Sequence, residues 1–167
     1  MPPESLLPVY LLTGSDRPKR SVALKRLRDR VGADSVELLS ADSASGGDVV
    51  AAANALGLFG ETAGRAVVVE SVENWRKADV DELRAYLADP TPDTVLVLVA
   101  DDLKKEAPLE KLVASKGEVL RYDIPRGGKL VSWVSAQFKE AGVRADGEAA
   151  RTLVEIGARI PSPSRPR

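Results

Sequence analysis

The sequence predicts an α/β fold in which a parallel β-sheet is covered by helices on both faces. Short apolar runs rich in Val and Leu alternate along the chain with amphipathic helical patterns. One run, TVLVLVA at residues 94–100, is almost wholly apolar, as expected of a central strand that is buried on both faces. The chain contains 44% hydrophobic residues, so it can bury the core that such a layered fold needs.

Strands and helices are expected to alternate from residue 8 to residue 122. The strands are predicted at residues 8–12, 35–39, 65–70, 94–100 and 118–122. The first helix is predicted at residues 17–31, because Asp16 is suited to cap its N-terminus and Gly32 to end it. A second helix is predicted at residues 48–56. Apolar residues at helical spacing predict two more helices, around residues 80–87 and 109–113.

A change of pattern near Pro125 indicates a domain boundary. The segment IPRGG breaks the alternation, and the sequence after it has only helical patterns. We therefore expect residues 1–125 to form the α/β domain and residues 126–157 to begin a small helical domain. The tail at residues 158–167 ends in RIPSPSRPR, and this composition predicts disorder.

Composition excludes several classes of function. The chain contains no Cys and no His, so it has no thiolate or imidazole for a metal site, a disulfide or a Ser-His triad. Lys and Arg total 24 against 25 Asp and Glu, so any contact with nucleic acid would have to be local. No apolar run approaches the roughly 20 residues that span a bilayer. A soluble, cytoplasmic protein without a bound cofactor is expected.

The stretch YLLTGSDRPKRSVAL, which begins at Tyr10, resembles a phosphate-binding loop between a strand and a helix. Gly14 and Ser21 fit the pattern G-x-x-x-x-G-K-[ST], but Lys19 replaces the second glycine and Arg20 replaces the lysine. Arginine is not equivalent to lysine at such a site. The sequence therefore predicts a P-loop or AAA+-like domain without a working ATP site.

The carboxylates of an ATPase site are also incomplete. The strand RAVVVE ends in Glu70, and Ser71 stands where a catalytic glutamate would be expected. On the simplest interpretation Gly14 only turns the chain, and Lys19 and Arg20 lie on a solvated helix face. An ATP site that uses Gly14, Arg20 and Ser21 remains the alternative.

Two further stretches could carry other functions. Asp101 and Asp102 follow a buried strand, but adjacent side chains point in different directions, so no metal site is expected there. The first helix is strongly basic, and a DNA-binding adaptor is therefore a second alternative, although a solvated face is the simpler interpretation. Its basic residues are Lys19, Arg20, Lys25, Arg26, Arg28 and Arg30.

Several longer stretches together resemble the delta subunit of the bacterial DNA polymerase III clamp loader. They include YLLTGSD, NALGLFGETAGRAVVVES, LRAYLADPTPDTVLVLVADD and the W-x-x-x-x-F-K-E-A-G helix end, and the resemblance runs from about Val9 to Gly157. It implies an ATPase-like domain that does not hydrolyse ATP, a small helical lid domain and then a helical collar. The implied function is to bind and open the sliding clamp for loading onto DNA during replication, without intrinsic catalysis.

The resemblance assigns clamp binding to Leu58 and Phe59. These residues lie between glycines in GLFGETAG, and adjacent exposed apolar residues usually have a partner. In the delta family the matching pair inserts into a hydrophobic pocket of the sliding clamp. If the pair packed under its own sheet instead, it would have no such role.

The resemblance also names partners. They are the sliding clamp (beta), DNA, and the gamma/tau and delta prime subunits if a collar were present. Family members continue well beyond the lid, whereas this sequence leaves the pattern after about Gly157. We therefore expect a fragment without the collar domain, which would not assemble stably into the pentameric loader.

Overall fold

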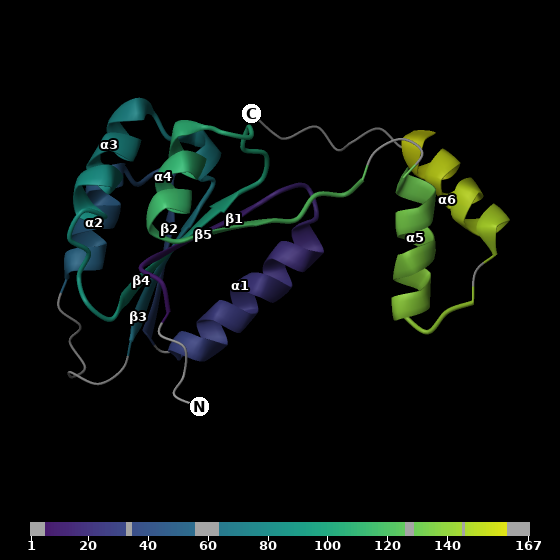
Figure 1. The fold of residues 1–167 in the computed structure, drawn as a ribbon, viewed down its shortest axis with the longest axis horizontal. Coiled ribbons are helices and arrows are strands. Elements are labelled where there is room, and N and C mark those ends of the chain that lie inside the picture. The colour runs from purple at the N-terminus through teal and green to yellow at the C-terminus, as the bar shows by residue number, and fades with distance from the viewer. Residues whose placement is uncertain (1–5, 33–34, 56–63, 126–128, 145, 160–167) are drawn as a thin grey trace. The chain divides into compact units, whose positions relative to one another are not determined.

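The computed structural model describes residues 6–32, 35–55, 64–125, 129–144 and 146–159 (Figure 1). The chain divides into two compact units, Met1–Asp123 and Ile124–Arg167. The first unit contains the whole sheet, and the second contains two helices. No helix among the described residues is long and apolar enough to cross a membrane.

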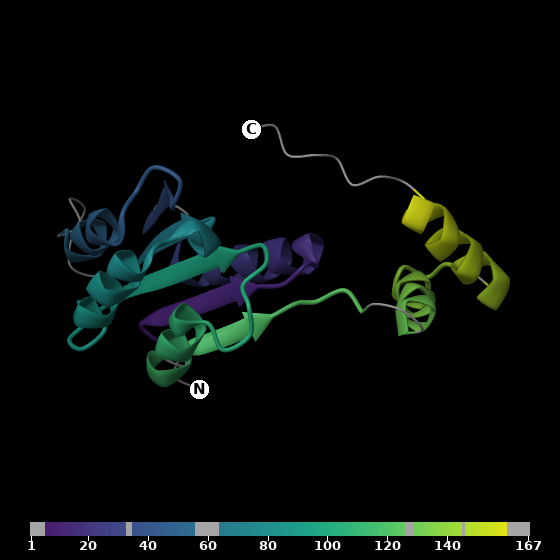
Figure 2. The ribbon, with the colours of Figure 1, turned by 90° about the horizontal axis from the view of Figure 1, so that it is seen from above.

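The first unit is built on a five-stranded sheet with the order β2-β3-β4-β1-β5, in which all neighbouring strands are parallel. Figure 2 shows β1 lying between β4 and β5, although these strands are far apart in sequence. The strands are β1 (Val9–Thr13), β2 (Val36–Ser40), β3 (Arg65–Glu70), β4 (Thr94–Ala100) and β5 (Glu118–Arg121).

Helices cover both faces of the sheet, because residues along the central strands alternate between two apolar clusters. On one face Leu11 and Leu98 pack with residues of three helices. On the other face Leu12 and Val97 pack with α1. The helices of the first face are α2 (Gly46–Asn54), α3 (Lys77–Tyr86) and α4 (Pro108–Lys116), and the helix of the second is α1 (Arg17–Val31). Figure 1 shows these two layers on opposite sides of the strands.

The helix ends are capped by the residues that follow. Asp16 accepts a hydrogen bond from the Lys19 N–H, and Gly32 ends α1 with φ 103° and an N–H bond to the Arg28 carbonyl. The predicted caps of α1 are therefore confirmed. At α2, Ser45 and Asp48 form a capping box.

Most predicted elements are found at or near their expected positions. The first helix and the strands β3 and β4 have the predicted bounds. The strands β1 and β2 begin one residue later than predicted, and β5 ends one residue earlier. The second helix was predicted to start at Asp48, but the capping box at Ser45 lets it begin at Gly46. A short 3-10 helix, η2 (Val72–Asn74), was not predicted.

The second unit contains α5 (Lys129–Glu140) and α6 (Gly147–Arg159). Val134 of α5 and Ala150 of α6 are buried. The two helices pack against each other. The turn that follows Glu140 includes Gly142, whose φ is 71°.

Candidate functional site

The candidate site lies where β1 leads into α1, at the carboxyl ends of the parallel strands. Ligands of open α/β sheets usually bind at this edge. A phosphate-binding loop in this place works by directing free backbone N–H groups and a helix N-terminus at the phosphates. Whether such groups are free here decides what the loop can bind.

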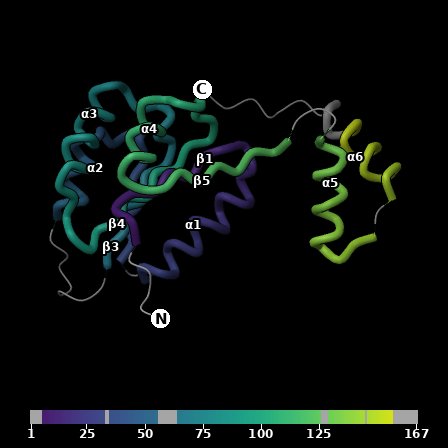
Figure 3. Tube along the Cα trace, in the orientation of Figure 1, coloured from purple at the N-terminus to yellow at the C-terminus, as the bar shows by residue number. Residues whose placement is uncertain are grey.

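Gly14 brings the loop into direct contact with the chain that follows β5. Its φ is 115°, a conformation that favours glycine, and a Cβ at this position would lie 2.2 Å from the Tyr122 carbonyl oxygen. The Tyr122 N–H donates to the Thr13 carbonyl, and its own carbonyl accepts from the Asp16 N–H, each at 2.8 Å. Figure 3 traces β1 and its loop into α1. Gly14 therefore allows the loop to pack closely against Tyr122 of the same chain.

The backbone donors at the start of α1 are already engaged. The Arg17 N–H donates to the Ser15 carbonyl at 3.1 Å. The Lys19 N–H donates to Oδ1 of Asp16, also at 3.1 Å. Pro18 has no N–H, and Asp16 is only 4% exposed. The buried carboxylate of Asp16 therefore occupies the helix N-terminus. A phosphate there would need these backbone N–H groups for itself and would be repelled by the negative charge of Asp16.

Arg20 lies inside the domain with 5% of its surface exposed. Its Nη1 donates to the Ala100 carbonyl oxygen, and its Nη2 donates to Oδ1 of Asp101 at 2.5 Å. The interpretation that placed Arg20 on a solvated face is therefore wrong. The charge is accommodated because the carboxyl end of β4 supplies both acceptors.

Both carboxylate oxygens of Asp101 receive a guanidinium group. Oδ1 accepts from Arg20, and Oδ2 accepts from Arg17, whose side chain is largely exposed. The Asp101 N–H also donates to a carboxylate oxygen of Glu73 at 3.3 Å. Partial burial raises the pKa of Asp101, but the hydrogen bonds from Arg20 and Arg17 outweigh it and hold that pKa below its usual value.

The remaining loop residues predicted from sequence are not gathered around a cavity. Lys19 and Ser21 are exposed on α1, and the Lys19 Nζ lies 3.8 Å from Oδ2 of Asp16. Glu70 is exposed at the end of β3, and Ser71 adopts a left-handed conformation with φ 63° as the chain enters η2. Among the described residues there is no group of three or more acidic side chains that could hold a metal ion.

The basic residues of α1 do not form one continuous cationic face. Arg20 is buried, and Lys25 pairs with Asp29 at 2.6 Å. Arg26 and Arg30 are exposed, and neither makes an ion pair or hydrogen bond with any residue that the structure describes. The free cations of this helix are therefore concentrated toward its C-terminal half.

Leu58 and Phe59, to which clamp binding was assigned, lie outside the described residues. The segment around them joins α2 to β3. Their role therefore rests on the sequence.

No protein-family model matches the sequence. No curated protein matches it either. The DNA clamp loader delta protein of Bacillus subtilis is similar in structure, with a TM-score of 0.63 and 21% sequence identity; the match covers 89% of this chain and 48% of that one.

Two proteins of Thermotoga maritima are also similar in structure. A DNA polymerase III gamma subunit-related protein has a TM-score of 0.52 and 18% identity, over 93% of this chain and 55% of that one. A variant of RuvB has a TM-score of 0.50 and 17% identity, over 87% of this chain and 48% of that one. The fold is AAA+-like. The predicted fold class is confirmed, and the chain spans about half the length of the clamp loader delta protein.

We expect the chain to bind Mg-ATP no more tightly than a dissociation constant of about 1 mM. The reason is that the backbone donors at the start of α1 are engaged and the carboxylate of Asp16 would repel the phosphates. Isothermal titration calorimetry with Mg-ATP measures this directly. Magnesium-dependent binding in the micromolar range would show that the loop rearranges to accept a nucleotide.

Replacing Asp101 by Asn is expected to lower the free energy of unfolding by about 1.5 kcal/mol at pH 7, because two charge-assisted hydrogen bonds weaken. The pKa of Asp101 is lowered in the folded state, so its stabilising contribution is present above the unfolded pKa of about 3.9 and is lost as the pH falls through the folded value. The difference between wild type and Asp101→Asn should therefore narrow below about pH 4. Urea denaturation at a series of pH values tests this, and a difference that widens toward acid would contradict it.

Proposed function

We propose that this chain carries the clamp-binding, AAA+-like domain of a clamp-loader delta subunit. Its function would be to bind the sliding clamp and help open it for loading onto DNA. One observation carries the proposal: in a fold shared with clamp-loader proteins, Asp16 caps the helix N-terminus that a phosphate would approach, and Arg20, at the place of the P-loop lysine, is buried and paired with Asp101. Such a domain is suited to binding a partner and not to nucleotide chemistry.

The contact with the clamp is proposed to be made by Leu58 and Phe59. The pair stands between Gly57 and Gly60 in the segment that resembles the delta family. Burying each side chain in an apolar pocket is worth roughly 1.5–3 kcal/mol. Two adjacent anchors of this kind are enough to dominate the affinity of an interface.

The proposed mechanism is a shift in the population of clamp conformations. A protein that binds the open clamp more tightly than the closed clamp favours opening by at most that difference in affinity. The chain needs no catalytic residue for this step. Hydrolysis of ATP, and assembly with the gamma/tau and delta prime subunits and with DNA in the DNA polymerase III holoenzyme, would belong to the complete loader.

The proposal is tested by retention on the immobilised sliding clamp of the same organism. The wild-type chain should be retained on the clamp and should pass through a column of immobilised albumin. Circular dichroism of the input shows that the protein is folded. A folded chain that is not retained at a concentration of about 10 μM, where micromolar binding is easily detected, would overturn the proposal.

A further inference from the structure

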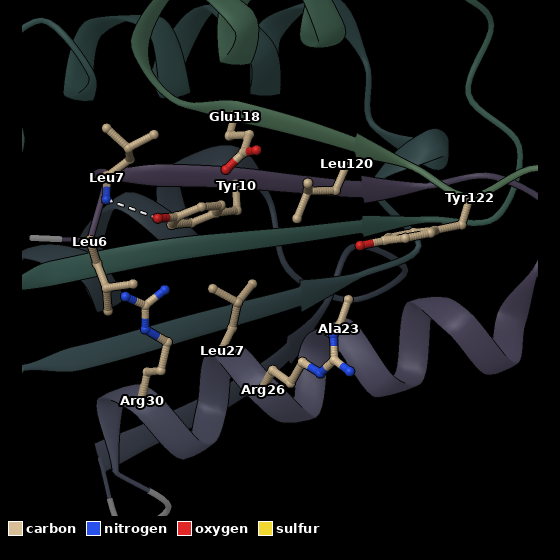
Figure 4. Close-up of a pocket in the computed structure, with 10 residues that line it drawn as sticks. All are labelled: Leu6, Leu7, Tyr10, Ala23, Arg26, Leu27, Arg30, Glu118, Leu120 and Tyr122. Carbon is tan, nitrogen blue, oxygen red and sulfur yellow. Dashed lines mark hydrogen bonds between the residues drawn. The ribbon is translucent and has the colours of Figure 1, made fainter. Parts of the chain in front are cut away.

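A groove of about 550 Å³ lies between α1 and the β1 and β5 strands of the first unit (Figure 4). Most of its walls come from the middle and C-terminal half of α1, the start of β1 and β5. Tyr122, whose backbone contacts the β1–α1 loop, also lines it. The residues on which the inference rests are Tyr10, Arg26, Leu27, Arg30, Glu118 and Leu120.

The floor of the groove is apolar. Leu27 is buried and Leu120 is half-buried, and Figure 4 shows both side chains between the helix and the strands. Tyr10 is only 6% exposed, and its hydroxyl accepts a hydrogen bond from the Leu7 N–H at 3.1 Å. The floor is therefore held in place and offers aliphatic surface to a ligand, while the Tyr10 ring does not offer a free face.

The helix wall of the groove is cationic. Arg26 and Arg30 are four residues apart, which places them about 6 Å apart along the helix axis. Figure 4 shows Arg30 extending toward Leu6 and Arg26 extending along α1 toward Ala23. As stated above, neither has an ion-pair partner among the described residues. The two guanidinium groups beside the apolar floor are therefore available to bind carboxylates of a ligand.

We infer that this groove binds a short acidic and apolar peptide segment of a partner protein. An apolar side chain of the peptide lies on Leu27 and Leu120, and carboxylates within one helical turn of it meet Arg26 and Arg30. Nucleic acid fits less well, because a phosphate backbone carries no apolar group that could be buried on Leu27 and Leu120. Glu118 on the strand wall would repel any anion, so the carboxylates of the peptide face the helix wall. Tyr122 is half-buried and also lines the groove, and an oligo-dT strand is therefore included in the test as the competing ligand. The inference does not depend on the proposed clamp contact.

A phage-displayed random dodecapeptide library tests the inference. The library is selected on the full chain and depleted on the Arg26→Glu plus Arg30→Glu variant. The enriched peptides should carry Asp or Glu within four residues of Leu, Ile or Phe. The best of them, labelled with fluorescein, should bind the wild type in fluorescence polarisation and bind the double variant at least 10-fold more weakly.

A matched control is Lys104→Glu plus Lys105→Glu, which makes the same change in net charge at exposed positions outside the groove. This control should keep wild-type affinity, and thermal melting should show that both variants fold. Leu120→Ala should also weaken binding of the peptide, because it removes part of the apolar floor. The inference is overturned if no acidic and apolar peptide is enriched, if both charge variants weaken binding equally, or if a fluorescein-labelled oligo-dT strand binds the groove and displaces the peptide.

Discussion

Replacing Leu58 and Phe59 together by alanine is expected to weaken binding to the sliding clamp by about two to three orders of magnitude, or roughly 3–4 kcal/mol. The proposed reason is that both side chains are apolar anchors in a clamp pocket, so their removal takes away most of the buried area at the centre of the interface. Surface plasmon resonance on the immobilised clamp measures the change. The melting temperature should barely move, because the side chains are proposed to contact the partner and not the core.

A matched control for this variant is Val22→Ala plus Leu38→Ala. These two apolar residues are 51% and 56% exposed and lie on α1 and β2, so the control removes exposed apolar surface elsewhere on the domain. It should leave the clamp affinity unchanged. If the Leu58 and Phe59 variant binds the clamp as the wild type does, the assignment of these residues fails. If it melts many degrees lower, the pair packs against its own domain.

Replacing Arg20 by alanine is expected to lower the free energy of unfolding by about 2–4 kcal/mol. The side chain is buried, so its loss leaves the Ala100 carbonyl without its donor and removes one of the guanidinium groups that bind Asp101. Urea denaturation monitored by tryptophan fluorescence measures the change. The effect should be smaller at acidic pH, where Asp101 becomes protonated in both states.

Arg17 offers a matched control, because it binds the same carboxylate from an exposed position. Its replacement by alanine should cost no more than about 1 kcal/mol, since exposed ion pairs contribute little. If the two variants lose the same free energy of unfolding, burial of Arg20 does not strengthen its interaction with Asp101.

The sequence was most informative where the pattern depends on neighbours in the chain. The bounds of α1, β3 and β4 were predicted, because apolar periodicity and local capping by Asp16 and Gly32 determine them. The 3-10 helix η2 was missed, because it depends on the left-handed conformation of Ser71, a residue with no strong preference for that region.

Burial of Arg20 was not predicted, because its partners Ala100 and Asp101 are distant in sequence. Helical spacing places an arginine on a face, but it does not show whether the facing strand end supplies acceptors. The position of Asp101 after a buried strand raises only the question of a metal site, which the sequence does not favour. A signal was available in the combination, because a basic residue early in α1 and an acidic residue after β4 meet at the same edge of an AAA+-like sheet.

Titration of the immobilised sliding clamp with the wild-type chain, with and without Mg-ATP, tests the central claim most directly. The claim is that this AAA+-like domain acts by binding a partner and not by binding a nucleotide. The account predicts clamp binding with the same dissociation constant in both conditions, because Asp16 caps the helix N-terminus and Arg20 is paired with Asp101, so neither is available to bind the phosphates. Absence of clamp binding, or binding that requires Mg-ATP, would contradict it.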